Sequence, residues 1–260
     1  MIVLHAPGAR VVVDPEHGGR LASFTIDDRE LLVTTADESI GWGCYPMVPF
    51  AGRLRHGRFE FDGNEHRLPP NLPPHAIHGT LLDRRWSVVE TATSSCRLRC
   101  EFAAPWPFDG TVEHVVELSD HSLDLTLVVD AEDRMPIQVG WHPWFVKPKR
   151  TRLRFGGIHV RDSEWIAADA STRPVPPLEP GTIDDCFDDP QGVLTIGYDD
   201  LVLELSSTCR YWVVYDGPSH ATCVEPQSGP PNAFGHDPDV VEAGDEFVHR
   251  FGISWTRADG

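Results

Sequence analysis

The segment Ser122-Leu-Asp-Leu-Thr-Leu-Val-Val129 carries the clearest strand pattern of the sequence. Its apolar side chains stand at every second position from Leu123 to Val129. Successive side chains of a β-strand point to opposite faces of a sheet, so this spacing places all of them on one face. Asp124 and Thr126 then lie on the other face, in a more polar environment. The segment therefore predicts a sheet with one face on an apolar core.

Seven further segments carry strand signals, because they are rich in β-branched, aromatic or alternating apolar residues. They are Arg10 to Val13, Leu21 to Ile26, Arg97 to Phe102, Thr111 to Leu118, Leu201 to Leu205, Tyr211 to Tyr215 and Glu246 to Trp255. No segment has the pattern of a long helix. A β-protein of 260 residues often forms one domain. We predict an all-β fold, a large antiparallel β-sandwich with two packed sheets, and a single domain over residues 1–260.

The connections between these strands are rich in turn-forming residues. Asp62-Gly63-Asn64 has the small polar residues that a tight hairpin requires. Proline-rich stretches at residues 69–74 and 174–180 are flanked on both sides by apolar and aromatic residues. We therefore expect ordered connections rather than disordered linkers.

The charge balance limits the partners. The formal net charge is −18 at pH 7, and Lys and Arg form no basic block. Nucleic-acid binding depends on neutralising phosphates, so we expect no nucleic-acid partner. No apolar run approaches the length that spans a bilayer, and the start of the chain does not resemble a signal peptide. We expect no membrane partner, a cytoplasmic location, and a monomer or homodimer that binds a small molecule.

Six cysteines are spread through the chain. With no signal peptide expected, they fit reduced thiols better than a disulfide framework. Cys96 and Cys100 are four residues apart but have no second close pair, so they give little support to a structural zinc site.

Three segments combine backbone-restricting Gly or Pro residues with an ionisable side chain. They are Pro73-Pro74-His75-Ala76-Ile77-His78-Gly79, Gly140-Trp141-His142-Pro143-Trp144-Phe145 and Val224-Glu225-Pro226-Gln227-Ser228-Gly229-Pro230-Pro231-Asn232-Ala233-Phe234. Each is expected at a turn or a strand end, where a rigid sheet can hold binding or catalytic groups.

Together with Pro49 to Phe59 and Ile183-Asp184-Asp185-Cys186-Phe187, these segments resemble the aldose 1-epimerase branch of the galactose mutarotase-like superfamily. The matching motifs occur in the family's order between residues 49 and 234. The resemblance implies the family's β-supersandwich fold. It also implies interconversion of the α and β anomers of a free hexose, with no cofactor and no metal.

The resemblance assigns roles to six residues. Glu225 is the expected general base, His142 the general acid, and His78 a donor to the same sugar oxygens. Arg53, Asp184 and Trp144 are the expected sugar-binding residues, with Asp185 an open alternative to Asp184. One carboxylate and one imidazolium suffice for this reaction. We expect Glu225 to be ionised at neutral pH, and neighbouring carboxylates to keep His142 partly protonated.

Two positions depart from the family pattern. Gly52 stands before Arg53 where the family commonly has asparagine, so one polar contact is absent or supplied by another residue. Trp144 stands where the family often has tyrosine, which removes a hydroxyl and enlarges the aromatic face. Both changes bear on the choice of substrate more than on the type of reaction.

Three rival interpretations of these motifs stay open. The first is a hexose-6-phosphate 1-epimerase, with the phosphate bound by Arg55, Arg58, Arg84 or Arg85. The second is a non-catalytic carbohydrate-binding protein of the same fold. The third is a metal-dependent β-barrel enzyme whose ligands are His75, His78, His142 and Glu225.

Overall fold

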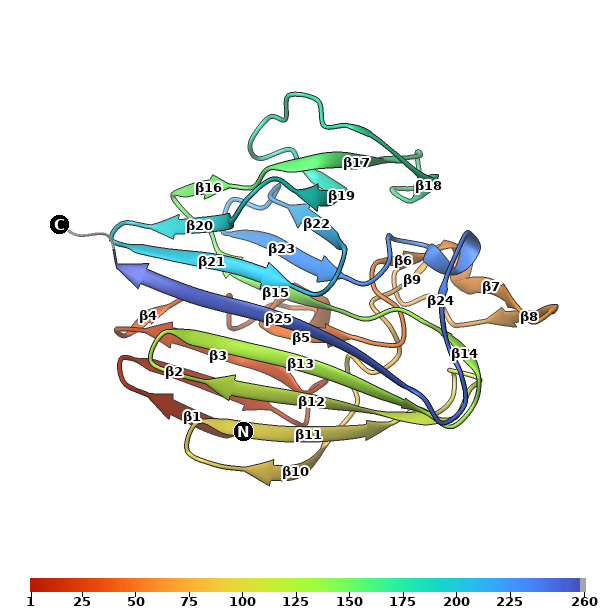
Figure 1. Cartoon of the computed structure of the whole chain (residues 1–260), viewed down its shortest axis with the longest axis horizontal. Helices are drawn as coiled ribbons and strands as arrows, with labels where there is room; N and C mark the ends of the chain where they lie inside the picture. Colours follow the sequence, from red (N-terminus) through yellow and green to blue (C-terminus); the bar gives the residue numbers. More distant parts are fainter. Residues whose placement is uncertain (258–260) are drawn as a thin grey trace.

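The computed structural model describes residues 1–257, apart from the side chains of residues 168–170. Two large antiparallel sheets are stacked on each other, as Figure 1 shows. The first has the strand order β1-β2-β3-β5-β15-β23-β22-β19-β17-β18, with β4 paired to β3. The second has the order β10-β11-β12-β13-β25-β21-β20-β16. The predicted β-sandwich is therefore confirmed.

The strands of the first sheet are β1 (Ile2–Ala6), β2 (Ala9–Asp14), β3 (Arg20–Ile26), β4 (Arg29–Glu30), β5 (Cys44–Met47), β15 (Gly140–Val146), β17 (Phe155–Arg161), β18 (Ala167–Pro174), β19 (Asp184–Pro190), β22 (Tyr211–Tyr215) and β23 (Ala221–Gln227). Those of the second are β10 (Ser87–Thr91), β11 (Ser95–Glu101), β12 (Gly110–Leu118), β13 (Ser122–Ala131), β16 (Arg150–Arg152), β20 (Leu194–Tyr198), β21 (Leu201–Ser207) and β25 (Glu246–Arg257).

Three short strand pairs and three 3-10 turns complete the described elements. The pairs are β6 (Arg53–Leu54) with β9 (Ala76–Ile77), β7 (Arg58–Phe61) with β8 (Asn64–Arg67), and β14 (Met135–Ile137) with β24 (Asp239–Val241). The turns are η1 (Ser39–Gly41), η2 (Arg55–Gly57) and η3 (Ala233–Gly235). Hairpin β7–β8 projects from one end of the sandwich (Figure 1).

The expected alternation is present in β13. Leu123, Leu125, Leu127 and Val129 are buried, whereas Asp124 is exposed. The eight predicted strands are all present, although β11 ends at Glu101, one residue before the predicted end. The predicted hairpin is also confirmed, since Phe61 pairs with Asn64 across the two-residue turn.

One large apolar cluster contains residues of both sheets, such as Leu127 of β13 and Val224 of β23. It fills the space between the sheets. All six cysteines are buried and free. Within residues 1–257, no helix is long and apolar enough to cross a membrane.

Candidate active site

Strands β15 and β23 lie side by side in the first sheet, and each has a core face and an opposite face. Phe145 and Val224 belong to the large apolar cluster. Side chains alternate along a strand, so His142, Trp144, Cys223 and Glu225 lie on the opposite face. This face carries a cavity of about 340 Å³.

The strand register explains how distant parts of the sequence meet in this cavity. Gly140 pairs with Gln227 and Trp144 pairs with Cys223, which sets His142 opposite Glu225. On the other side of β15, His142 pairs with Tyr45 of β5. Side chains directly opposite each other on neighbouring strands are in contact range. The register therefore builds one row of side chains across three strands, of which His142 and Glu225 line the cavity.

A second row runs parallel to the first. Trp144 pairs with Cys223, Cys223 with Tyr215, and Tyr215 with Asp184 of β19. Asp184, Trp144 and Tyr215 all line the cavity. The six predicted site residues all line it, and Arg53 does so from β6, outside the large sheets.

The expected acid, His142, and the expected base, Glu225, are in direct contact. Nε2 of His142 lies 3.3 Å from Oε1 of Glu225, and the two side chains are 6% and 3% exposed. The side-chain amide of Gln227 donates a hydrogen bond of 3.2 Å to Oε2 of the same carboxylate. The two groups are therefore held at the floor of the cavity rather than at its mouth.

His78 reaches the same place from the loop after β9. Its ring centroid lies 4.8 Å from that of His142, with the two rings nearly perpendicular. Its backbone N–H donates to the carbonyl of Gly52, and it has a positive φ of 58°. Gly79 follows with φ of 83°, and a Cβ there would lie 1.9 Å from the carbonyl oxygen of Val48. Only glycine fits at this close approach, which fixes the position of His78.

Burial sets the charge states in the free cavity. It raises the pKa of Glu225 well above its ordinary value, and Asp184 raises it further, whereas Gln227 and Arg53 act in the opposite direction. Burial also lowers the pKa of His142 to about 3. The expectation that neighbouring carboxylates keep His142 partly protonated was wrong, because desolvation dominates and Arg20 lowers this pKa further. The uncharged forms of both groups are favoured.

Several buried polar atoms at the cavity have no hydrogen-bond partner among the described residues. They are Nδ1 of His78, Nδ1 of His142 and Oε1 of Gln227. Buried polar groups normally find a partner, and orphaned ones around a cavity indicate where a polar ligand can bind. A polyhydroxylated ligand supplies both donors and acceptors.

The two candidate aspartates differ in their ion pairs. Both line the cavity. Nε of Arg161 lies 3.0 Å from Oδ1 of Asp185, whereas the contact between Nη1 of Arg161 and Oδ2 of Asp184 is 3.7 Å. Asp184 therefore has the carboxylate that is less occupied by Arg161.

The indole of Trp144 is already stacked. Its ring lies parallel to that of His142 at 5.2 Å and to that of His220 at 6.3 Å, and its Nε1 donates to the carbonyl of Ile40. These imidazoles compete with a sugar ring for the faces of the indole. Trp144 also supports His142 from the side.

Tyr45 and Gln227 contact the acid–base pair and were missed in the sequence. Tyr45 stacks on His142 at 4.9 Å and donates its hydroxyl proton to the carbonyl of Ile40. Gln227 holds the carboxylate of Glu225. A strand period of two from Glu225 could have found Gln227, but Tyr45 has no signal in its own segment.

The ligand set expected for a metal-dependent enzyme is not assembled. His75 lies in a separate group with His56 and Glu164, within which possible ligand atoms are at most 4.8 Å apart. A second such group joins His142 and Glu225 to Cys223. The four residues expected as ligands are therefore divided between two places.

The chain is similar to several known proteins. The family model described as aldose 1-epimerase matches residues 1–254. YphB, an uncharacterized protein of Escherichia coli (strain K12), is 28% identical over 162 residues, which cover 59% of this chain and 56% of YphB. The chain thus spans about half the length of that relative.

Solved structures share the fold. The GalM/aldose epimerase homologue from C. elegans superposes with a TM-score of 0.87 at 15% identity, covering 99% of both chains. A galactose mutarotase-like protein from Clostridium acetobutylicum gives 0.83 at 17% identity, covering 98% of this chain and 94% of that one.

Proposed function

The chain belongs to the aldose 1-epimerase family, and on that premise we propose that it is a mutarotase that interconverts the α and β anomers of a free hexose by general acid and base catalysis. The observation that carries the proposal is the contact of 3.3 Å between Nε2 of His142 and Oε1 of Glu225 at the floor of the cavity. Two groups so placed can reach neighbouring oxygens of one sugar ring.

In the proposed reaction, Glu225 takes the proton of the anomeric hydroxyl. The electron pair of that O–H bond forms the carbonyl as the bond between C1 and the ring oxygen breaks, and His142 gives its proton to the ring oxygen. The aldehyde rotates about the C1–C2 bond. The ring oxygen then attacks the other face of C1, returning its proton to His142 while Glu225 returns a proton to O1. No net proton, electron or atom is exchanged.

The environment of the pair supports these roles. A carboxylate with a raised pKa is a stronger base, and a buried site keeps water from competing with the sugar. Arg53 and the amide of Gln227 favour the ionised form of Glu225. When Glu225 is ionised, the proton of the pair is available on His142, and the two groups remain neutral in sum.

The remaining predicted residues would position the sugar. His78 donates to the oxygens near C1, Arg53 binds a ring hydroxyl through its guanidinium, and Asp184 accepts from hydroxyls across the ring. All three line the cavity. Gly52, where the family commonly has asparagine, has a φ of 66° and packs against Pro231, so a side chain there would meet that proline.

A free sugar is favoured over a sugar phosphate. None of Arg55, Arg58, Arg84 and Arg85 is among the residues that line the cavity. Arg55 is instead paired with Asp162 and Glu164. Arg161 does line the cavity, but it faces Asp184 and Asp185. A phosphate there would have to displace carboxylates.

Polarimetry tests the proposal. Fresh α-D-glucose or α-D-galactose is followed to equilibrium with the wild-type protein and with Glu225→Gln. We expect a large acceleration by the wild type and nearly none by the variant. Equal rates for the two proteins would remove Glu225 from its role, and glucose 6-phosphate in the same assay tests for a sugar-phosphate epimerase.

Two further arms separate catalysis by these side chains from binding alone and from metal-dependent catalysis. A non-catalytic binding protein would bind the sugars without accelerating mutarotation. A metal-dependent enzyme would lose activity on chelation and regain it with one divalent cation, whereas acid–base catalysis by Glu225 and His142 requires no added cation.

A further inference from the structure

The turn between β17 and β18, residues 162–166, forms part of the cavity wall and carries a tryptophan at the mouth. Trp165 lines the cavity and is 48% exposed. Glu225 and His142, by contrast, are almost fully buried. A ligand ring at the acid–base pair therefore lies deep, and Trp165 is placed to contact a part of the ligand that extends outward.

The backbone at this tryptophan is unusual. Trp165 has a φ of 63°, in the left-handed region that bulky side chains rarely adopt. Such conformations persist only where the surroundings hold them, and they concentrate at functional sites. The turn must therefore be fixed by other contacts.

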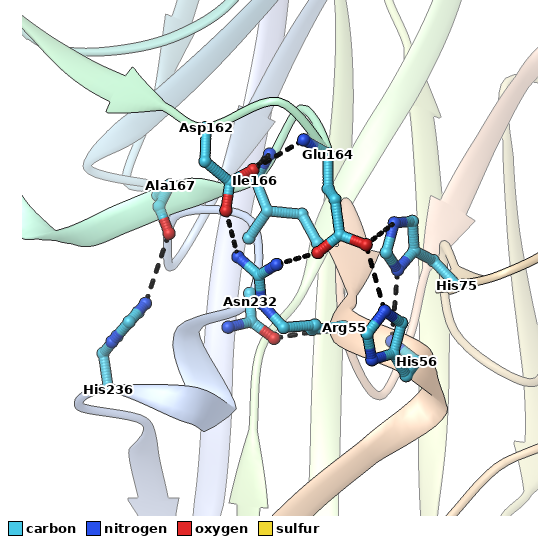
Figure 2. A network of polar contacts seen from close by, with 9 residues as sticks. All are labelled: Arg55, His56, His75, Asp162, Glu164, Ile166, Ala167, Asn232 and His236. Carbon is cyan, nitrogen blue, oxygen red and sulfur yellow. Dashed lines mark hydrogen bonds and ion pairs between the residues drawn. The ribbon is translucent and has the colours of Figure 1, made fainter.

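Figure 2 shows those contacts. Asp162 accepts from the backbone N–H groups of Glu164 and Ile166, which closes the turn on itself. The guanidinium of Arg55, in η2, pairs with both Asp162 and Glu164. We call these residues, together with His56 and His75, the clasp.

The two histidines of the clasp hold the other side of Glu164. Nε2 of His56 lies 3.0 Å from Oε1 of Glu164, and Nε2 of His75 lies 3.9 Å from the same atom. The backbone N–H of His56 donates to Nδ1 of His75, and the two rings are stacked (Figure 2). The turn is thus anchored to the loop that also delivers Arg53 and His78 to the cavity.

The indole itself is oriented by Arg161. Cζ of Arg161 lies 3.8 Å from the centroid of the Trp165 ring, and Nε of Arg161 is paired with Asp185. A cation over an aromatic face stabilises that arrangement. The indole is therefore held in place while much of its surface stays exposed.

We propose that Trp165 is the platform of a second sugar subsite, which binds the outer pyranose of a reducing disaccharide whose reducing ring lies at Glu225 and His142. This inference rests on the proposed function. The C–H face of a pyranose packs on a flat apolar surface, and an indole offers the largest such surface of any side chain. Trp144 is less available for this role, because imidazoles already stack on it.

The test compares one-ring and two-ring substrates. Mutarotation of glucose, maltose and cellobiose is followed by polarimetry for the wild type, Trp165→Ala and Trp165→Phe. For Trp165→Ala we expect KM to rise about tenfold for the disaccharides, which corresponds to the loss of one aromatic stacking contact, with little change for glucose. Trp165→Phe keeps a flat face and should restore most of the disaccharide affinity.

Each other result overturns the inference in a recognisable way. Equal losses for glucose and disaccharides would place Trp165 against the reacting ring, and no loss for either would leave no subsite there. Glucose turnover without any disaccharide turnover by the wild type would also overturn the subsite while the proposed function stands. Absence of turnover with every sugar would instead refute the proposed function.

Discussion

Nε2 of His142 and Oε1 of Glu225 lie 3.3 Å apart on neighbouring strands, in a place almost closed to solvent. The contact follows from the register of β15 and β23, which sets the two residues opposite each other. Burial favours the uncharged form of each group. A site that needs an ionised carboxylate here must hold it at a cost in stability.

Replacement of Glu225 by Gln should therefore separate activity from stability. A group whose pKa is higher in the folded than in the unfolded protein stabilises the fold at pH values below its unfolded pKa. This stabilisation is lost as the pH rises through the folded pKa. At pH 8 we expect Glu225→Gln to be more stable than the wild type, by about 1 kcal/mol as measured by thermal unfolding, and the difference to vanish near pH 4. Mutarotation should fall about 10²-fold to 10⁴-fold.

Glu117, an exposed residue of β12, offers the matched control. Glu117→Gln removes a carboxylate on the same kind of element without touching the cavity, so its melting temperature should follow the wild type at both pH values. A Glu225→Gln protein that is less stable than the wild type at pH 8 would contradict the account of a carboxylate destabilised by burial.

The pH dependence of kcat/KM should report the same carboxylate. Because the pKa of Glu225 is raised, we expect kcat/KM to fall on the acidic side at a pH above 4.5, the ordinary pKa of a glutamate. Asp184 raises this pKa and Arg53 lowers it. We therefore expect the acidic limb to move to lower pH in Asp184→Asn and to higher pH in Arg53→Gln.

These opposite displacements distinguish electrostatic coupling from loss of sugar contacts. Both variants remove a predicted sugar contact, so both should lower the height of the profile. Only coupling to Glu225 moves the limb in opposite directions. Parallel displacement of the two profiles would show that the titrating group is not Glu225.

The sequence predicted the positions of the strands better than it predicted which strands pair with each other. Alternation within one segment is enough to identify β13, because it depends on local spacing. The contact between His142 and Glu225 depends on pairing two strands far apart in the chain, which no local pattern specifies. The motifs predicted both residues as candidates. They did not predict that the two residues lie in one row with Tyr45.

The charge states could not be read from the sequence for a related reason. Ordinary pKa values predict an ionised Glu225 and a partly protonated His142. Burial reverses both tendencies, and burial is a property of the assembled sheet and its covering loops. The roles of the predicted site residues stay predictions, to be tested by the variants above.

Gly79 should be far less tolerant of substitution than another glycine with a similar backbone. A Cβ at Gly79 would collide with the carbonyl of Val48, whereas nothing lies within 4 Å of a Cβ at Gly63, and both residues have positive φ. We expect Gly63→Ala to cost about 1 kcal/mol, from the backbone conformation alone. Gly79→Ala should cost more than about 3 kcal/mol in chemical denaturation.

The same collision has a functional consequence. Because Gly79 follows His78 directly, relief of the clash must move the imidazole, so Gly79→Ala should also lose mutarotation under conditions where it remains folded. Gly63→Ala, in the turn of hairpin β7–β8, should keep it. Equal stability of the two variants would show that Val48 can withdraw and that His78 is not fixed in this way.

His114 should contribute to a loss of stability in mild acid, together with His142 and His78, whose pKa values burial also lowers. It is fully buried between the sheets, where its Nδ1–H donates to the carbonyl of Gly19 and its Nε2 accepts from the indole N–H of Trp141. Both nitrogens are thus satisfied in the neutral ring. Burial lowers its pKa to about 4, although the hydrogen bond to Gly19 acts in the opposite direction.

A histidine whose pKa is lower in the folded than in the unfolded protein stabilises the fold at pH values above its unfolded pKa of 6.5. This stabilisation is lost as the pH falls toward the folded pKa. Between pH 6.5 and about 4 the wild type should lose about 3 kcal/mol through His114. His114→Gln should be less stable at pH 7 but should lose correspondingly less on acidification, as measured by urea unfolding at several pH values. His121→Gln, at an exposed ring, should keep the wild-type dependence. If His114→Gln followed the wild-type curve in parallel, the proton taken up on acid unfolding would belong to another group, and the neutral hydrogen-bonded imidazole between the sheets would carry no pH sensitivity.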